Sequence, residues 1–133
     1  LNDNAGNFKR NSNAIIGANF ETSTPSQAPI LTKNWIENLN YRLELCKNDD
    51  EKLLEILNSH IEFERIHPFS DGNGRTGRLI MMYLCFQEKI APFVIEKEDR
   101  ALYMSYLREQ NVDIIFKKVK ELQKFERKRM EKF

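Results

Sequence analysis

Cysteine is scarce in this sequence, and long apolar runs are absent. Among its 133 residues only Cys46 and Cys85 are cysteines, and each lies within an apolar pattern of helical period. Two cysteines form no disulfide framework, so we interpret both as reduced core residues of a protein from a reducing compartment. No stretch approaches the ~18 consecutive apolar residues of a transmembrane helix, which predicts that no segment crosses a membrane.

An excess of one charge sign is also lacking. The formal net charge of +1 gives no general attraction to nucleic acid or to an anionic membrane. The segment Lys117–Phe133 holds eight Lys or Arg residues against three Glu, but no aromatic platform or zinc-ligand spacing accompanies it. We therefore interpret it as the solvated face of a helix, and expect neither nucleic acid nor a membrane as a direct partner.

Glycine and proline are few, with five and four residues respectively, and no low-complexity linker divides the chain. The length predicts one domain over residues 1–133. The chain begins with Leu1 rather than Met, which leaves open whether the natural chain is longer, and we expect it to lack N- or C-terminal regulatory segments.

The early part of the chain has a weak hairpin pattern. Ala14–Phe20 has the composition of a short strand, the run Glu21–Pro29 is polar and contains proline, and Ile30 and Leu31 suggest a second short strand. The sequence therefore predicts a small β-hairpin over residues 14–31.

A helical period begins after Thr32, which we expect to be an N-cap. The apolar residues that recur on one face are Trp35, Leu39, Leu43 and Cys46. The polar run 48–50 then breaks the pattern and caps a second helix. That helix must end at Ile66, because Pro68 disfavours the α-helical conformation at His67.

Three further helices are predicted in the second half of the chain. One begins near Gly74, and after an interruption at Pro92 two more cover about Lys97–Gln110 and Asp113–Lys132. The fold class we expect is all-α, a helical bundle with one small β-hairpin near its N-terminus.

Three familiar motifs are excluded near residue 70. Gly72–Gly77 matches the G-x-G-x-x-G pattern of dinucleotide-binding folds, but the preceding element is a predicted helix and not a strand. The same glycines have the spacing of a P-loop, yet Arg78 and Leu79 stand where Lys and Ser or Thr are needed. His60 and His67 lack the i, i+4 spacing of helical zinc ligands.

The same region has the features of an anion-binding site. Gly72, Asn73 and Gly74 form a predicted turn at the start of a helix, where unpaired N–H groups and the helix dipole favour an anion. Arg75 and Arg78 lie three residues apart in the first turn, so both guanidinium groups can reach the same phosphate oxygens.

Two more residues complete the candidate site. Asp71 is a lone carboxylate beside this positive charge and suits Mg²⁺ shared with phosphates. His67 can act as a base near neutral pH. Singly, each of these residues is more often a plain loop residue, but together within twelve positions they indicate phosphoryl or nucleotidyl transfer.

The stretch 67–78, His-Pro-Phe-Ser-Asp-Gly-Asn-Gly-Arg-Thr-Gly-Arg, resembles the Fic family signature H-P-F-x-[DE]-G-N-G-R-x-x-R without a departure. The resemblance extends from about Asn13 to Lys124. It implies a helical bundle with the motif between two central helices and a β-hairpin flap upstream. The implied activity is transfer of AMP from ATP–Mg²⁺ to a Ser, Thr or Tyr hydroxyl of a target protein.

The resemblance also implies a role for each motif residue. His67 would take the proton from the attacking hydroxyl, and Asp71 would hold Mg²⁺ that bridges the α- and β-phosphates. Asn73 and the backbone N–H groups of Gly72 and Gly74 would stabilise the α-phosphate as charge develops on it.

The remaining contacts to ATP would come from α-helical residues after the motif loop. Arg75 and Arg78 would hold the β- and γ-phosphates. Tyr103 and Asn111 stand where the family's adenosine contacts fall, although a core tyrosine and a helix-ending asparagine are equally good interpretations.

Docking and regulation are predicted less directly. We expect the flap residues Ile15, Ile16, Gly17 and Ala18 to pair with the target by β-augmentation. In the family an inhibitory helix with the pattern [ST]-x-x-x-E-[GN] pairs with the second motif arginine. Here only Ser105–Glu109 approaches that pattern, and Gln110 follows it, so we expect any inhibitor to lie outside these residues or on a separate antitoxin-like protein.

Two other functions remain open from the sequence. One is transfer of a different phosphate-containing group on the same fold, and the other is an ATP-binding regulatory module. The Asn/Lys/Ile-rich composition suggests a bacterial source, for which we expect a cytoplasmic, toxin-like protein or a secreted effector.

Overall fold

The computed structural model describes residues 6–15 and 21–132, and within these ranges the chain forms five α-helices and no strand. The helices are α1 (Ala28–Leu45), α2 (Asp49–Ile66), α3 (Asn73–Gln87), α4 (Arg100–Glu109) and α5 (Asp113–Met130), with one 3₁₀ turn, Lys97–Asp99, before α4. The predicted all-α class is confirmed for this part of the chain.

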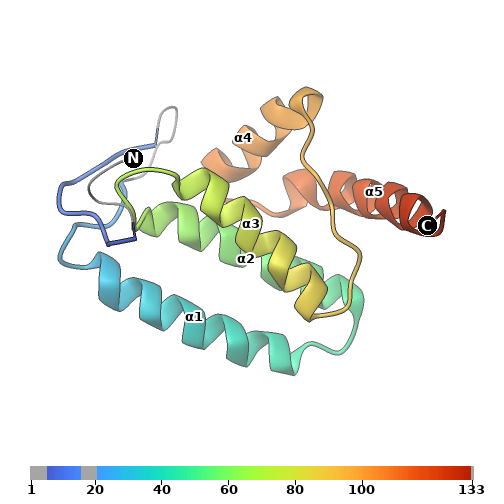
Figure 1. The fold of residues 1–133 in the computed structure, drawn as a ribbon, viewed down its shortest axis with the longest axis horizontal. Helices are drawn as coiled ribbons and strands as arrows, with labels where there is room; N and C mark the ends of the chain where they lie inside the picture. The colour runs from blue at the N-terminus through green and yellow to red at the C-terminus, as the bar shows by residue number, and fades with distance from the viewer. Residues whose placement is uncertain (1–5, 16–20, 133) are drawn as a thin grey trace.

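Helix α2 is the centre of the fold, and both α1 and α3 pack against it (Figure 1). It buries residues around most of its circumference: Leu53, Ile56, Leu57, Ser59, His60, Ile61, Phe63, Glu64 and Ile66. Side-chain hydrogen bonds link α1 and α4 to main-chain carbonyl groups of α2. In α1 the Trp35 indole donates to the Ser59 carbonyl at 2.8 Å, and in α4 the Tyr106 hydroxyl donates to the Leu57 carbonyl.

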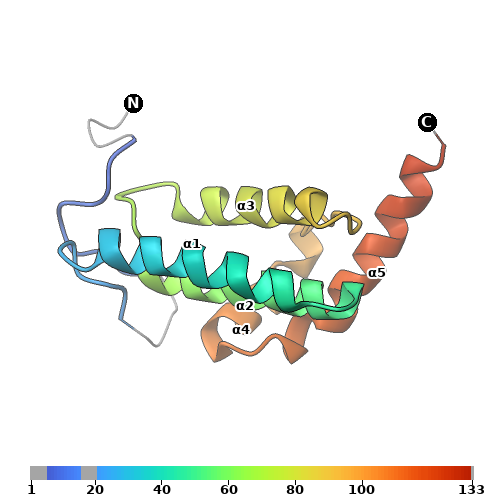
Figure 2. The same ribbon diagram turned by 90° about the horizontal axis from the view of Figure 1, so that it is seen from below.

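The loop between α2 and α3 lies at one end of the molecule, next to the N-terminal segment, and the end of α5 lies at the other (Figures 1 and 2). This arrangement separates the motif from the basic C-terminal helix. It also places the polar segment before α1 beside the motif loop.

Both ends of α2 follow from local sequence. At its start the Asn48 side chain accepts a hydrogen bond from the Glu51 N–H at 2.9 Å, and three acidic residues in the first turn suit the positive end of the helix dipole. At its end His67 adopts a left-handed conformation, with φ 48° and ψ 59°, directly before Pro68. The predicted end at Ile66 is confirmed.

Helix α1 begins earlier than the sequence pattern predicted. It starts at Ala28, with Pro29 in its first turn, where a missing N–H costs nothing and the fixed φ of proline suits the helix. Thr32 is therefore not the N-cap. Its hydroxyl lies inside the helix and donates to the Ala28 carbonyl at 2.7 Å.

The earlier start of α1 corrects the predicted hairpin. Ile30 and Leu31, expected to form its second strand, are helical. Ala14 and Ile15 form no strand, and residues 16–20 lie outside the described part of the chain. The second strand was predicted because two apolar residues after a polar run resemble a strand as well as the exposed first turn of a helix.

The last two helices agree closely with their predicted ranges. In α5 the residues that face inward are Ile115, Val119 and Gln123, and the Gln123 amide donates to the Ala91 carbonyl at 2.7 Å. Most of the Lys and Arg residues of α5 are exposed, which confirms the solvated basic face. Across the described residues, none of the helices has the length and apolar character needed to span a bilayer.

Both cysteines are free, but Cys46 is only partly buried, so the predicted core position is confirmed for Cys85 alone. Cys85 is fully buried in α3, and burial raises the pKa of its thiol to about 12. It is therefore an unreactive core residue.

Candidate active site

The motif loop, residues 67–72, is a tight connection between the end of α2 and the start of α3. Two residues in left-handed conformations bound it: His67 at φ 48° and Gly72 at φ 76°. Asn73 is 3% exposed and its side chain closes the loop. It accepts from the Phe69 N–H at 2.9 Å and donates to the Phe69 carbonyl at 2.7 Å.

A second set of bonds fastens the loop to the N-terminal segment. The Lys9 N–H donates to the Pro68 carbonyl at 2.8 Å. The buried Lys9 ammonium donates to the Ile66 carbonyl at 3.2 Å and to Asn13 at 2.8 Å. The Asn13 amide in turn donates to the Phe69 carbonyl at 2.9 Å. Residues 9–13 therefore act as a strap over the motif loop.

His67 is half-buried at the end of α2. Burial lowers the pKa of its imidazole, the positive charge of Lys9 lowers it further, and the Glu64 main-chain carbonyl acts in the opposite sense. The Nδ1 atom is buried and makes no hydrogen bond within the described residues. Since Nδ1 faces the interior, Nε2 is the nitrogen available to a reactant, and the ring is neutral at physiological pH.

The start of α3 presents an uncapped helix end. Its N-cap is Gly72, which offers no side chain to the first-turn N–H groups. Arg75 and Arg78 are both exposed on this turn. Asp71 is exposed as well, and its Oδ1 accepts the Gly72 N–H at 2.8 Å, which leaves Oδ2 for another partner. The predicted anion-binding residues are thus brought together.

Asn73 has a structural task that the sequence did not reveal. Its amide oxygen and one of its two N–H groups are used by Phe69, so only the second N–H remains for a phosphate. Its predicted contact with the α-phosphate stays a prediction.

Arg78 lies beside buried polar groups of α2 and α4. A methyl group at Gly74 would lie 3.1 Å from Arg78 Nη1 and 3.9 Å from Glu64 Oε1, so both side chains approach the same side of α3. Burial raises the pKa of the Glu64 carboxyl to about 7, against the opposing effect of Arg78. Arg78, a candidate for phosphate binding, therefore lies close to the buried carboxyl group of Glu64.

His60 completes this cluster from the core. Its Nε2 lies 2.6 Å from the Tyr103 hydroxyl. Burial and the nearby Arg78 lower the pKa of His60 to about 3, so the ring is neutral and belongs to the core. Gly77 lets α3 approach this ring closely, since a Cβ there would lie 2.8 Å from His60 Cε1.

The two predicted adenosine residues have different surroundings. Tyr103 is only 6% exposed, but it lines a pocket of about 320 Å³ together with Arg78, Ile95, Glu96, Lys97, Arg100 and Met104. Asn111 is not among the lining residues. Its side chain accepts the Asp113 N–H at 3.0 Å at the start of α5. Tyr103 thus shares a pocket with the motif residue Arg78, whereas the Asn111 side chain is used in the turn before α5.

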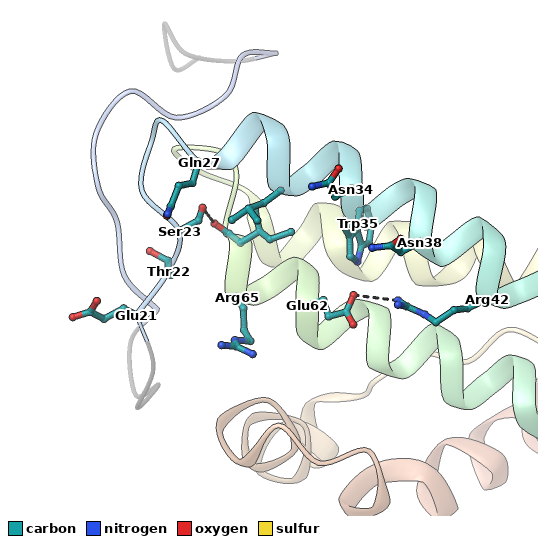
Figure 3. A pocket seen from close by; sticks show the side chains of 12 residues that line it. Glu21, Thr22, Ser23, Gln27, Asn34, Trp35, Asn38, Arg42, Glu62 and Arg65 are labelled. Carbon is teal, nitrogen blue, oxygen red and sulfur yellow. Dashed lines mark hydrogen bonds and ion pairs between the residues drawn. The ribbon is translucent and has the colours of Figure 1, made fainter.

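Another pocket, of about 550 Å³, lies between α1, α2 and the segment 21–27 (Figure 3). The Arg42 side chain pairs with Glu62 at 3.2 Å on its wall. None of the residues that line it belongs to the motif.

Several residues of the site were missed by sequence reasoning. His60, Glu64 and His67 fall at i, i+4 and i+7, a spacing that could have indicated their common face. Lys9 and Asn13 gave no such signal, because their contacts reach 57 and 56 residues along the chain from a polar segment without periodicity.

Comparisons with known proteins agree with this geometry. Residues 1–85 match the sequence model of the Fic/DOC family. A protein adenylyltransferase Fic of Aedes aegypti is 45% identical over 53 residues, which cover 40% of this chain and 11% of that protein. A probable protein adenylyltransferase of Aquifex aeolicus is 28% identical over 109 residues, which cover 77% of this chain and 30% of that protein.

Solved structures show the same fold. A Fic-domain signaling protein of Bacteroides thetaiotaomicron superposes with a TM-score of 0.66 at 25% identity, over 75% of this chain and 38% of that one. BepC, a Bartonella tribocorum effector solved with AMPPNP, gives a TM-score of 0.67 at 18% identity, over 86% of this chain and 56% of that one. The family match covers well over half of the chain, and this chain belongs to the Fic/DOC family.

Proposed function

We propose that this chain is the catalytic domain of a protein adenylyltransferase, which moves AMP from ATP to a Ser, Thr or Tyr hydroxyl of a target protein. The observation that carries the proposal is the position of His67. A half-buried imidazole with a lowered pKa begins the short loop that leads to an uncapped helix start with two exposed arginines. Relatives that carry the name protein adenylyltransferase support the same reaction.

The reaction follows from these positions. The hydroxyl oxygen of the target attacks the α-phosphorus of ATP, and its proton passes to His67 Nε2. A new oxygen–phosphorus bond forms while the bond between the α-phosphorus and the bridging oxygen breaks. Pyrophosphate leaves with that electron pair. A neutral His67 is needed for the first step, which fits the lowered pKa of its ring.

The phosphates would be held by the start of α3. The backbone N–H of Gly74 belongs to the uncapped first turn, where the helix dipole stabilises negative charge. The Gly72 N–H donates to Asp71 Oδ1 and would change partner to join it at a phosphate. The second N–H of Asn73 can join them at the α-phosphate. Arg75 and Arg78, with planar guanidinium groups, would hold the β- and γ-phosphates.

Asp71 fits the role of a magnesium ligand. A site for Mg²⁺ on a nucleotide usually uses one or two carboxylates together with phosphate oxygens and water. Asp71 is exposed and keeps one carboxylate oxygen outside its bond to the Gly72 N–H. When bound, Mg²⁺ would neutralise charge on the phosphates and favour departure of pyrophosphate.

The adenosine would lie near Tyr103. The pocket that Tyr103 lines also contains Arg78, so a nucleotide with its phosphates at α3 can place its base there. The Asn111 side chain already accepts the Asp113 N–H at the start of α5, and a contact between it and adenosine would require that bond to break.

Target docking is proposed for the segment that the sequence predicted as the first strand of a flap. The residues Ile15, Ile16, Gly17 and Ala18 would pair with an extended segment of the target. All but Ile15 lie outside the described residues. An Ile16→Pro variant removes one N–H donor, so it should reduce labelling of the target without changing ATP affinity. Unchanged labelling would contradict the docking role.

Inhibition would come from a separate antitoxin-like protein or from residues outside this chain. Glu109, the one candidate for an internal inhibitory glutamate, is exposed and pairs with the adjacent Arg108 at 3.4 Å. This supports a solvent-facing role. Glu109→Gly should therefore leave self-labelling unchanged, and a large increase would identify Glu109 as the inhibitor.

The test compares ATP labelled at the α-phosphate with ATP labelled at the γ-phosphate. The chain is incubated with Mg²⁺ and a bacterial lysate, with ATP labelled at the α- or the γ-phosphate. Protein bands labelled only from α-ATP support AMP transfer, labelling from γ-ATP indicates phosphate transfer, and no labelling indicates an ATP-binding module. A His67→Ala variant should label ~10²–10⁴-fold more slowly while retaining ATP affinity by calorimetry.

A further inference from the structure

Glu64 is a buried acid one helical turn before the proposed base. Its side chain is 5% exposed, its Oε2 lies 4.0 Å from His67 Nδ1, and its Oε1 lies 3.8 Å from His60 Nε2. Neither Oε1 nor His67 Nδ1 has a hydrogen-bond partner among the described residues. The Nδ1 atom of His67 faces Oε2, and a buried ring nitrogen without a hydrogen-bond partner is costly unless it has a function.

The charges around Glu64 are few and come from three helices. From α2, His60 is neutral and His67 changes charge during the reaction. From α3, Arg78 favours the carboxylate form of Glu64. From α4, burial raises the pKa of the Tyr103 and Tyr106 hydroxyls, so both are neutral. From the strap, the positive charge of Lys9 acts on His67.

We propose that Glu64 is the positioning residue of His67. Its carboxylate faces Nδ1 and keeps that nitrogen turned to the interior, so that Nε2 points toward the nucleotide. It also stabilises the imidazolium that forms when Nε2 accepts the proton of the target hydroxyl. The role rests on the proposed function, because it concerns the same base.

The 4.0 Å separation is longer than a hydrogen bond. Bonds between catalytic groups are often long without substrate and shorten in the reacting complex. A carboxylate next to a base can stabilise its charged form across this distance, since the surrounding interior screens charge weakly. Glu64 therefore acts on His67 most strongly after the proton has been transferred.

One competing arrangement uses no carboxylate. The Glu64 main-chain carbonyl also raises the pKa of His67, and a ring held by the carbonyl alone would not respond to a change of the side chain. A second competing role is purely structural, in which Glu64 serves only to support Arg78 and the packing of α3. The experiment must distinguish both from positioning.

Imidazole NMR gives a direct measurement, because the chain has only two histidines. The pKa of His60 is about 3, so between pH 5 and 9 only the His67 signals should titrate. In the wild type we expect two inflections, since Glu64 and His67 titrate in overlapping ranges and each senses the other. In Glu64→Gln we expect a single inflection at lower pH, because the anion that favours the charged ring is gone.

Kinetics provide the second measurement. Glu64→Gln should lower the rate of labelling from α-labelled ATP by about 10-fold or more, which is part of the ~10²–10⁴-fold contribution of a general base. KM for ATP should change little. Glu64→Asp should recover part of the rate, because it restores the charge at a longer distance.

Glu62→Gln is the matched control. Glu62 lies on the same helix but pairs with Arg42 on the opposite side, and its replacement removes the same charge. It should leave both the His67 titration and the rate unchanged.

The outcomes separate the two proposals. A His67 titration identical in wild type and Glu64→Gln would overturn the positioning role, whether or not the rate falls. Absence of labelling by the wild type would count against the adenylyltransferase function, while the NMR titration would still test the contact between Glu64 and His67.

Discussion

Replacing Glu64 with glutamine is expected to make the folded protein less sensitive to alkaline pH. The pKa of this carboxyl is raised from 4.5 to about 7, chiefly by burial. The folded state therefore holds the proton more tightly than the unfolded state. The contribution of Glu64 to the free energy of unfolding is fully present below pH 4.5. It falls as the pH rises to about 7 and stays at the lower value above that pH.

The magnitude follows from the two pKa values. The difference between 4.5 and about 7 is equivalent to about 3.4 kcal/mol, at 1.36 kcal/mol for each pKa unit. About a quarter of this loss is already present at pH 5, so about 2.5 kcal/mol separates pH 5 from pH 8.5. A glutamine cannot ionise, and the variant should lack this part of the pH dependence.

Urea unfolding at pH 5 and pH 8.5 measures the effect. The difference between the two pH values is compared for wild type, Glu64→Gln and Glu62→Gln, so any cost of burying the glutamine amide cancels. We expect the pH-dependent loss to shrink by about 1–3 kcal/mol in Glu64→Gln alone. Equal losses in all three proteins would refute the reasoning, because they would show that Glu64 ionises as readily in the folded state as in the unfolded chain.

Three further predictions follow from the site. Gly77→Ala places a methyl group 2.8 Å from His60 Cε1, so it should lower the free energy of unfolding by about 1–3 kcal/mol, and an unchanged Tm would contradict this close packing. Lys9→Met removes a cation that lowers the pKa of His67. The pKa of His67 measured by NMR should rise, and the acid limb of the activity profile should move to higher pH. A fall of this pKa would contradict the assignment. Asp71→Ala should abolish the rise of labelling with Mg²⁺ concentration, and a wild-type response would exclude Asp71 as the metal ligand.

Much of the fold could be predicted from sequence because its causes are local. Pro68 disfavours a helical conformation at His67 through its own ring, without any contact to the rest of the chain. Asn48 caps the N–H groups of its own helix. The motif loop is local too, since its glycine, its asparagine and the first turn of α3 are adjacent in sequence. The amino-acid sequence by itself therefore determined where α2 ends, where α3 begins and which residues gather at their junction.

The start of α1 was local as well, but the pattern was ambiguous. Two exposed apolar residues, Ile30 and Leu31, fit a strand by composition. They are helical because Pro29 begins a helix whose inward face, from Ala28 to Leu43, packs on α2. Tertiary packing decided between two conformations that the local sequence allowed.

Only the tertiary structure decided what surrounds the base. The charge of Glu64 means little on an isolated helix, where water would keep its pKa near 4.5. In the folded protein the pKa of Glu64 is raised because α3 and α4 exclude that water. They do so through contacts such as the one between His60 and Tyr103, which lie 43 residues apart. Periodicity shows that a helix has an apolar face, but not that a central helix is covered on several sides. The sequence determined the groups proposed to react, and the packing of distant helices determined their protonation.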